Sequence, residues 1–249
     1  MGKLLKPVYN ITMKPTDELR FFTSPEHQCS YIDDKTASTL FCDPDIVPNK
    51  QLYSTLSALG FRRSGQYLYR PSCPACNSCI PLRIHCHAYP HSRSEKRVLK
   101  RNKALTVTIV AAGFSKQHYD LYSRYIVDRH IDGDMYPPSP EQYQNFLLSD
   151  WSNTHFAEFH LDGKLIGCCV FDHLEHGLSA VYTYFDVAYE YRSLGKFAVL
   201  WLIEHSLEQG LDYLYLGYWI DECRKMAYKA QFHNIQAYSQ EQWLNLELP

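Results

Sequence analysis

The sequence has no apolar run that approaches the roughly 18 consecutive residues of a membrane-spanning helix. Its N-terminal segment also lacks the apolar stretch of an export signal. These two absences predict a cytoplasmic protein without a membrane partner. Internal repeats and low-complexity tracts are absent as well, which argues against solenoid and disordered architectures. Its 249 residues suffice for one large domain or two small ones.

An overall excess of positive charge is missing too, because 25 Lys and Arg stand against 27 Asp and Glu. This balance argues against a generally basic nucleic-acid binder. The charges are unevenly distributed, however, since residues 1–103 carry a net charge of +8 and residues 104–249 carry −10. We therefore expect the N-terminal part of the chain, and not the C-terminal part, to contact phosphate groups.

Nine cysteines, an odd number, are more typical of thiols or metal ligands than of a disulfide framework in such a chain. Cys73, Cys76 and Cys79 form two consecutive C-x-x-C steps, a spacing that can hold zinc or part of an iron–sulfur cluster. A fourth ligand would be remote, and Cys29 is the preferred one. Further candidates are Cys42, Cys86 and His27. The alternative is a group of reduced thiols in a tight loop.

The order of predicted elements indicates an α+β fold. Before residue 104 we predict a helix at 49–59 and a strand at 80–86, in which Pro81 favours a sheet edge or a strand start. After it the patterns predict, in order, a strand at 105–111, helices at 115–130 and 141–148, strands at 154–161, 164–171 and 178–185, a helix at 194–208, a strand at 213–216, a helix at 222–230 and an extended segment at 235–243.

This order resembles the acetyltransferase-like (GNAT) fold, a mixed sheet with flanking helices. The resemblance covers the C-terminal part of the chain, whereas the cysteines of the C-x-x-C steps precede it. We therefore predict a smaller cysteine-rich N-terminal region at 1–103, which ends in a basic helix, and an acetyltransferase-like domain at 104–249.

Five cations of the segment 93–101 fall on one face if the segment is helical. They are Arg93, Lys96, Arg97, Lys100 and Arg101. A row of cations suits a phosphate backbone, because each neutralised phosphate releases condensed counterions. The pattern predicts a helix that binds nucleic acid, and the alternative is a solvated basic face without a ligand.

Two segments nearer the C-terminus could bind anions. Arg192 and Gly195 form an R-x-x-G turn between a strand and a helix, where backbone N–H groups face an anion. Phe197 stands where users of coenzyme A have a small residue, which argues against acetyl-CoA as the donor. The second segment carries two cations and two aromatics at helical spacing, Lys225, Tyr228, Lys229 and Phe232. One interpretation is that this face is partly buried in the core. The other is that it binds a carboxylate or the terminal phosphates of an RNA.

Six longer strings resemble the bacterial aspartate/glutamate leucyltransferases, the short relatives of eukaryotic arginyl-tRNA–protein transferases. They are FFTSPEHQCSYI, YRPSCPACNSCIPLRI, SRSEKRVLKRN, VYTYFD, YRSLGKFAVLWLIEHSLEQGLDYLYLGYWI and CRKMAYKAQF. The resemblance implies transfer of leucine from leucyl-tRNA to the α-amine of proteins that begin with Asp or Glu, which creates an N-degron for protein degradation. The basic helix then becomes the predicted tRNA-binding surface.

The implied reaction asks for few catalytic groups. The aminoacyl ester is already activated and an α-amine has a pKa near 7.7–8.0, so positioning and an oxyanion donor should dominate. Asp186 is the candidate that receives or relays the proton of the amine, with Tyr182 nearby, and the alternative is that Asp186 caps a turn. Arg70 and Arg83 are the first candidates for the carboxylate of the acceptor, because a guanidinium matches its planar shape. Arg63 and Lys225 come next, and Arg192, Tyr228 and Lys229 complete the predicted substrate-binding residues.

Other functions stay open at this point. Arginine could replace leucine as the transferred residue, and a GNAT-type N-acetyltransferase would use acetyl-CoA instead of tRNA. A non-enzymatic RNA- or metal-binding module would use the cysteines and the basic helix, but it leaves the segment around Lys225 and Lys229 without a role.

Overall fold

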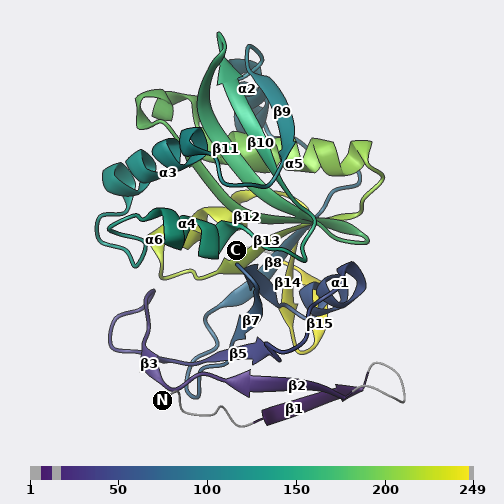
Figure 1. Ribbon diagram of the computed structural model, residues 1–249. Helices are drawn as coiled ribbons and strands as arrows, with labels where there is room; N and C mark the ends of the chain where they lie inside the picture. The colour runs from purple at the N-terminus through teal and green to yellow at the C-terminus, as the bar shows by residue number, and fades with distance from the viewer. Residues whose placement is uncertain (1–6, 13–17, 247–249) are drawn as a thin grey trace.

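A larger and a smaller β-sheet organise the computed structural model, which describes residues 7–12 and 18–246 (Figure 1). The strands of the larger sheet are, in spatial order, β15 (Gln242–Asn245), β14 (Ile235–Ser239), β8 (Ile80–His85), β13 (Tyr213–Trp219), β12 (Gly177–Phe185), β11 (Lys164–His173), β10 (Thr154–Leu161) and β9 (Thr106–Ala111). Its neighbouring strands are antiparallel, except that β12 and β13 run parallel. This mixed sheet confirms the predicted α+β class.

The smaller sheet comes from the cysteine-rich N-terminal region. Its antiparallel strands are, in spatial order, β1 (Pro7–Thr12), β2 (Glu18–Thr23), β5 (Thr39–Cys42), β7 (Tyr67–Pro71) and β6 (Arg62–Ser64), and a separate short pair consists of β3 (His27–Gln28) and β4 (Thr36–Ala37). The predicted helix after β5 is α1 (Lys50–Ala58), which begins where the Asn49 side chain accepts a hydrogen bond from the Leu52 N–H. Buried side chains of α1 and of these strands share one apolar core.

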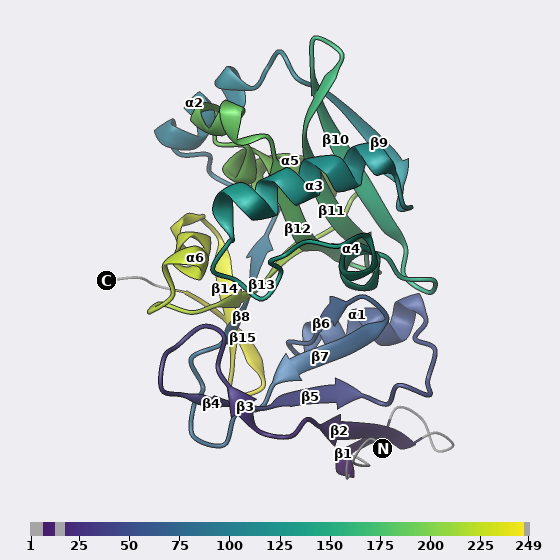
Figure 2. The same cartoon turned by 60° about the vertical axis from the view of Figure 1, so that its left-hand side comes forward.

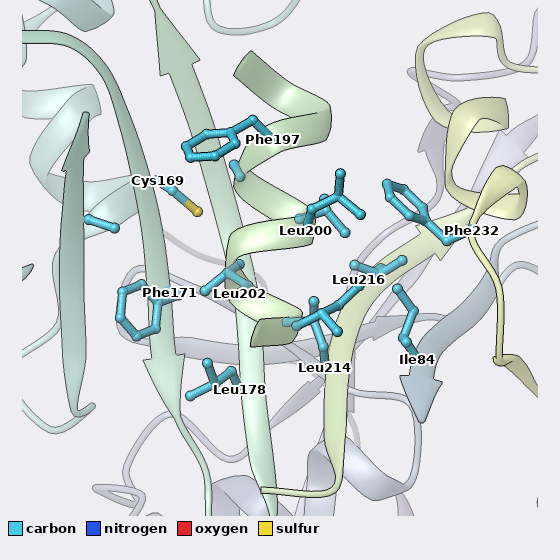
Figure 3. Close-up of a cluster of buried hydrophobic side chains, with 14 of the residues drawn as sticks. Ile84, Cys169, Phe171, Leu178, Phe197, Leu200, Leu202, Leu214, Leu216 and Phe232 are labelled. Atoms are coloured by element: carbon cyan, nitrogen blue, oxygen red, sulfur yellow. The ribbon is translucent and has the colours of Figure 1, made fainter. Parts of the chain in front are cut away.

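Helices cover both faces of the larger sheet (Figure 2). They are α2 (Arg93–Arg101) and α5 (Leu194–Glu208) on one face, and α3 (Lys116–Arg129) and α4 (Pro140–Leu147) on the other. Figure 3 shows Leu200 of α5 over Leu216 and Leu214 of β13, and all three are buried. Each such side chain contributes about 1.5–3 kcal/mol to folding. None of the helices within the described ranges has the length and hydrophobicity of a membrane span.

The helix predicted at 222–230 is shorter than expected. It consists of one α-helical turn, α6 (Arg224–Ala227), followed by a 3₁₀ turn, η2 (Tyr228–Gln231). A 3₁₀ turn has three residues per turn and not 3.6, so residues four apart no longer share a face. As a consequence Lys225 is exposed whereas Lys229 is buried.

Of the two positions that Pro81 favours, the strand start is confirmed, because β8 begins at Ile80, one residue before Pro81, and the sheet edge is not. β8 lies inside the larger sheet, between β13 and β14. β14 pairs with Leu82–Ile84 and stops there, so Pro81 lies beyond the end of that ladder and needs no donor on that side. The division of the chain at residue 103 stays a prediction. β8 and α2 lie before residue 103 in the sequence, but both pack with the C-terminal part of the chain.

Candidate active site

The larger sheet opens where its parallel neighbours β12 and β13 separate. Their register contains three pairs, Gly177 with Tyr213, Leu178 with Leu214 and Ser179 with Tyr215. Beyond these pairs β12 continues to Phe185 and β13 to Trp219 without pairing to each other. We call this opening the fork. Backbone groups along it have lost a strand partner, and buried ones need another.

Arg62, from β6 of the smaller sheet, fills the base of the fork. Its Nη1 donates to the Ser179 hydroxyl at 3.0 Å and to the Tyr215 carbonyl at 3.2 Å, and its Nη2 donates to the Ala180 carbonyl. Gly217 makes room for the guanidinium, because a Cβ there would lie 3.1 Å from Arg62 Nε. The φ of Gly217 is +80°, a conformation that favours glycine, and the register of β13 shifts at this residue. Arg62 thus replaces the missing strand.

Lys229 of η2 satisfies another carbonyl of β13. Its Nζ donates to the Tyr218 carbonyl at 2.7 Å and lies 3.2 Å from Met226 Sδ. The side chain is buried, and no described carboxylate forms an ion pair with Lys229 or with Arg62. Burial, together with the nearby charge of Arg62, lowers the pKa of Lys229 to about 7. A substantial fraction of Lys229 is therefore uncharged at neutral pH.

Tyr182 of β12 lies in an aromatic cluster beside the fork. The ring centroids of Phe146, Tyr122 and Tyr125 lie 5.4, 6.2 and 6.3 Å from its own. Its hydroxyl is buried and has no hydrogen-bond partner in the described part of the chain. Burial and the neighbouring phenols, that of Tyr228 among them, raise the pKa of Tyr182 far above its ordinary value. The hydroxyl is therefore a protonated donor with a free hydrogen bond to offer.

A buried ion pair ties the smaller sheet to the base of the fork. Arg63 Nε lies 2.8 Å from Asp172 Oδ2, and neither side chain is exposed. The Tyr53 hydroxyl donates to the same carboxylate at 2.7 Å, and the Thr154 hydroxyl donates to it at 2.6 Å. Tyr53 also lies 3.3 Å from the Ser179 hydroxyl. Arg63 is thus fully engaged inside the protein, although the sequence offered it as a substrate ligand.

Asp186 directly follows β12 and caps the 3₁₀ segment η1 (Val187–Arg192). Its Oδ1 accepts from the Ala188 N–H at 3.0 Å, and its Oδ2 accepts from Lys164 Nζ at 3.1 Å. Burial opposes the charged form, but these hydrogen bonds outweigh it and lower the pKa of Asp186. No hydrogen bond joins it to the Tyr182 hydroxyl. These contacts are those of a residue that caps a turn, which was the alternative to a catalytic role for Asp186. The lowered pKa also makes its carboxylate a weaker base.

Arg83, one of the two arginines predicted first for the acceptor, is held by its neighbours. Its Nε donates to Gln236 Oε1 at 2.8 Å. Its guanidinium lies 3.7 Å from the Tyr213 ring centroid and 4.4 Å from that of Trp243. Cation–π contacts of this kind fix the side chain on the sheet.

Arg70, the second arginine predicted for the acceptor carboxylate, borders a cavity of about 270 Å³. The lining also includes Cys73, Asn77, Cys79, Tyr218 and Tyr238. Arg70 makes a long hydrogen bond of 3.4 Å to the Leu59 carbonyl and lies 5.2 Å from the Phe61 ring centroid. Its guanidinium is therefore freer than that of Arg83 to bind a ligand.

The remaining predicted substrate ligands separate in space. Arg192 Nη1 donates to the Arg101 carbonyl at 2.8 Å, so this residue docks α2. Lys225 forms a surface ion pair with Asp132 at 3.0 Å. Tyr228 and Lys229 remain at the fork, the former beside Tyr182.

The five predicted cations of α2 are all exposed, while Glu95 and Val98 face the core. The helix begins with a capping box, in which Ser92 and Glu95 accept each other's backbone N–H. At its other end Arg101 donates to the Tyr191 carbonyl, and Asn102 Nδ2 donates to the Arg192 carbonyl at 2.9 Å. The predicted basic face is confirmed, and these hydrogen bonds join its C-terminal end to the last residues of η1.

The four predicted metal ligands come near one another without forming a ligand set. Burial, together with the neighbouring thiols of Cys73, Cys29 and Cys76, raises the pKa of Cys79 to about 12. Cys73 Sγ, however, points to the Ser38 carbonyl and Cys76 Sγ to the Ser78 hydroxyl. Among the described residues no group of three or more His, Cys, Asp or Glu has the arrangement of a metal site. A zinc or iron–sulfur centre stays a prediction of the sequence.

Sequence reasoning did not select Arg62. Its partners Ser179 and Tyr215 lie 117 and 153 residues further along the chain, beyond the reach of any local pattern. One signal was present, because two adjacent arginines in a strand point to opposite faces. At this edge of the smaller sheet Arg63 is buried and Arg62 is half-buried, and a cation removed from water in this way needs polar partners.

Comparison of the sequence with models of protein families identifies the class of protein that has this site. Residues 27–97 match the N terminus, and residues 117–239 the C terminus, of the arginine-tRNA-protein transferase. The chain belongs to this family. Its curated relatives include aspartate/glutamate leucyltransferases from Alcanivorax borkumensis, Marinobacter nauticus and Hahella chejuensis, which are 52%, 50% and 49% identical to it. These matches cover 93%, 90% and 92% of this chain and 96%, 95% and 97% of the relatives.

The similarity to a solved structure is much weaker. The structure of L-PGS from Bacillus licheniformis matches with a TM-score of 0.42 and 11% sequence identity, over 80% of this chain and 68% of that one. A likeness of this size carries no argument about the fold or the function.

Proposed function

We propose that the protein transfers leucine from leucyl-tRNA to the α-amine of proteins that begin with Asp or Glu, and thereby creates an N-degron. One observation carries this proposal, the 52% identity over 93% of the chain with an aspartate/glutamate leucyltransferase. Family membership supports the aminoacyl-tRNA as co-substrate.

The fold proposed for residues 104–249 is acetyltransferase-like. Its support is the order β9, α3, α4, β10, β11, β12, α5, β13, α6, β14, together with parallel strands that separate after three pairs. Phe197 fills the position that is small in users of coenzyme A, and its ring packs 5.1 Å from that of Phe159. The fork therefore suits a different acyl donor, the ester of an aminoacyl-tRNA.

The leucyl ester is placed in the fork with its carbonyl oxygen toward Tyr182. The Tyr182 hydroxyl would donate a hydrogen bond to this oxygen as negative charge develops on it. The acceptor enters with its carboxylate toward Arg70, whose guanidinium can form a charge-assisted pair. With an activated ester and an amine of modest pKa, this positioning supplies most of the rate enhancement.

A direct assay tests the proposal. The purified protein is incubated with leucyl-tRNA or arginyl-tRNA and with peptides that begin with Asp, Glu, Asn or Lys, and the mass of each peptide is measured. We expect the mass of one leucine to be added to the Asp and Glu peptides. Transfer of arginine alone, or of an acetyl group when acetyl-CoA is supplied, contradicts the proposal.

The basic face of α2 is the proposed tRNA-binding surface. A variant with Lys96→Gln, Arg97→Gln and Lys100→Gln is expected to have a higher KM for leucyl-tRNA, while its kcat changes little. Each lost phosphate contact should reduce the slope of log affinity against log salt by about 0.9 for contacts to a duplex, or about 0.7 for contacts to a single strand. Titration of tRNA binding at several salt concentrations measures this slope. An unchanged slope would make the helix a solvated surface.

Arg70→Ala is expected to lower kcat/KM for Asp and Glu peptides by about 30-fold or more, because a buried charge-assisted pair contributes about 2–5 kcal/mol. Activity on Asn and Gln peptides should change little, since a neutral amide does not use the cation. Kinetics on the four peptides measure this selectivity. Arg83→Ala is the matched control, which should affect all four alike. An equal loss on all four peptides in Arg70→Ala would place the acceptor site elsewhere.

A further inference from the structure

Lys229 occupies an unusual position for a lysine. It is 9% exposed, on the short segment that lies beside β13 (Figure 2). A neutral lysine amine has two N–H donors and one lone pair. The carbonyl of Tyr218 at 2.7 Å and the sulfur of Met226 at 3.2 Å can accept from the two donors. The lone pair then remains for a third partner.

Among the groups that face Lys229, Arg62 favours this neutral form and Cys223 opposes it. Arg62 of β6 contributes a positive charge, Cys223 ahead of α6 contributes a thiol, and β13 and α6 contribute the uncharged Tyr218 carbonyl and Met226 sulfur. No described carboxylate compensates the two cations. Burial and the repulsion from Arg62 bring the pKa of Lys229 to about 7, in the range where a general base is most effective.

Other candidates near the fork are unsuited to accept a proton. Arg62 does not lose its proton in proteins, so it cannot act as a base. The Tyr182 hydroxyl keeps its proton, because burial raises its pKa. Asp186 is occupied by Lys164 and by the Ala188 N–H.

We propose that Lys229 is the general base of the transfer, an inference that rests on the proposed function. The free α-amine of the acceptor attacks the ester carbonyl, so that a C–N bond forms while the C–O bond to the ribose breaks. The attacking nitrogen gives one proton to the lone pair of Lys229 Nζ. The resulting ammonium returns that proton to the departing ribose oxygen, so atoms and charge balance within the site.

The decisive variant is Lys229→Arg, which keeps a donor for the Tyr218 carbonyl but cannot accept a proton. We expect kcat to fall by about 10²–10⁴-fold. Below pH 7 the wild-type kcat/KM should depend on two ionisations, those of Lys229 and of the acceptor amine, and therefore fall about 100-fold per pH unit. Lys229→Arg should retain the ionisation of the amine alone, with about a tenfold fall. Lys116→Met, on the exposed surface, is the control.

A variant with near wild-type rates and an unchanged pH profile would overturn the proposal and leave Lys229 as a structural donor. A second variant is Lys229→Ala, and circular dichroism is measured first to establish that it is folded. Ethylamine added to the folded variant should restore part of the leucine transfer. Independently, NMR of lysine labelled at Cε in the wild-type protein should show one titration near pH 7, and the absence of any such titration overturns the proposal. Wild-type protein that titrates in this way but transfers no leucine would instead contradict the proposed function.

Discussion

Asp172→Ala is expected to lower the free energy of unfolding by about 3–5 kcal/mol, because it leaves the Arg63 guanidinium buried without a counter-charge. Arg63 and Asp172 are both fully buried, and Tyr53 and Thr154 donate to the same carboxylate. Loss of the Asp172 carboxylate removes the hydrogen bonds that connect β11 to Arg63 of β6 and to Tyr53 of α1. Urea unfolding at neutral pH measures the change as a lower midpoint with a similar slope.

Two controls separate the buried pair from ordinary charge effects. Asp120→Ala breaks the exposed pair of Lys116 and Asp120 and should cost less than about 1 kcal/mol. The double variant Arg63→Met with Asp172→Leu should recover much of the stability, because apolar residues of similar volume can replace a buried pair. A loss below about 1 kcal/mol in Asp172→Ala would mean that water or another donor compensates the arginine.

Tyr182→Phe is expected to lower kcat for leucine transfer by about 10²–10³-fold, the usual effect of removing one oxyanion donor. The KM for leucyl-tRNA should change little, because the hydrogen bond strengthens as charge develops on the carbonyl oxygen. Since the Tyr182 hydroxyl has no partner among the described residues, its removal leaves no protein group unsatisfied. Single-turnover measurements with preformed leucyl-tRNA isolate the transfer step.

Tyr184→Phe is the matched control on the same strand. Its hydroxyl lies 3.2 Å from that of Tyr143, inside the core between α3, α4 and the sheet. Its removal should lower stability and leave the transfer rate within a few-fold of the wild type. Equal rate losses in the two variants would assign both tyrosines to packing and remove Tyr182 from the proposed chemistry.

The sequence predicted the elements better than it predicted their contacts. Local periodicity and turn residues suffice for α5, whose predicted bounds are those observed, and for the hairpin of β10 and β11. The basic face of α2 follows from helix geometry alone. The choice between Arg70 and Arg83 does not, because it depends on Tyr213, Trp243 and Gln236, which come from distant strands.

Burial is the property that sequence reasoning misjudged most at the fork. Lys225 and Lys229 look equivalent along a regular helix, yet one pairs with Asp132 on the surface and the other is buried against β13. A change from an α-helical to a 3₁₀ turn separates them. Helix ends of this kind depend on tertiary packing and not on the residues of the segment itself.

The place of β8 between β13 and β14 has a consequence for biosynthesis. β8 is translated in the first half of the chain, while both of its neighbours lie near the C-terminus. The backbone donors and acceptors of β8 therefore have no strand partners until nearly all of the polypeptide has been synthesised. Contacts so distant in sequence slow folding, because a long loop must close before they form. For the same reason a nascent chain released early exposes an unpaired strand, which is a starting point for aggregation.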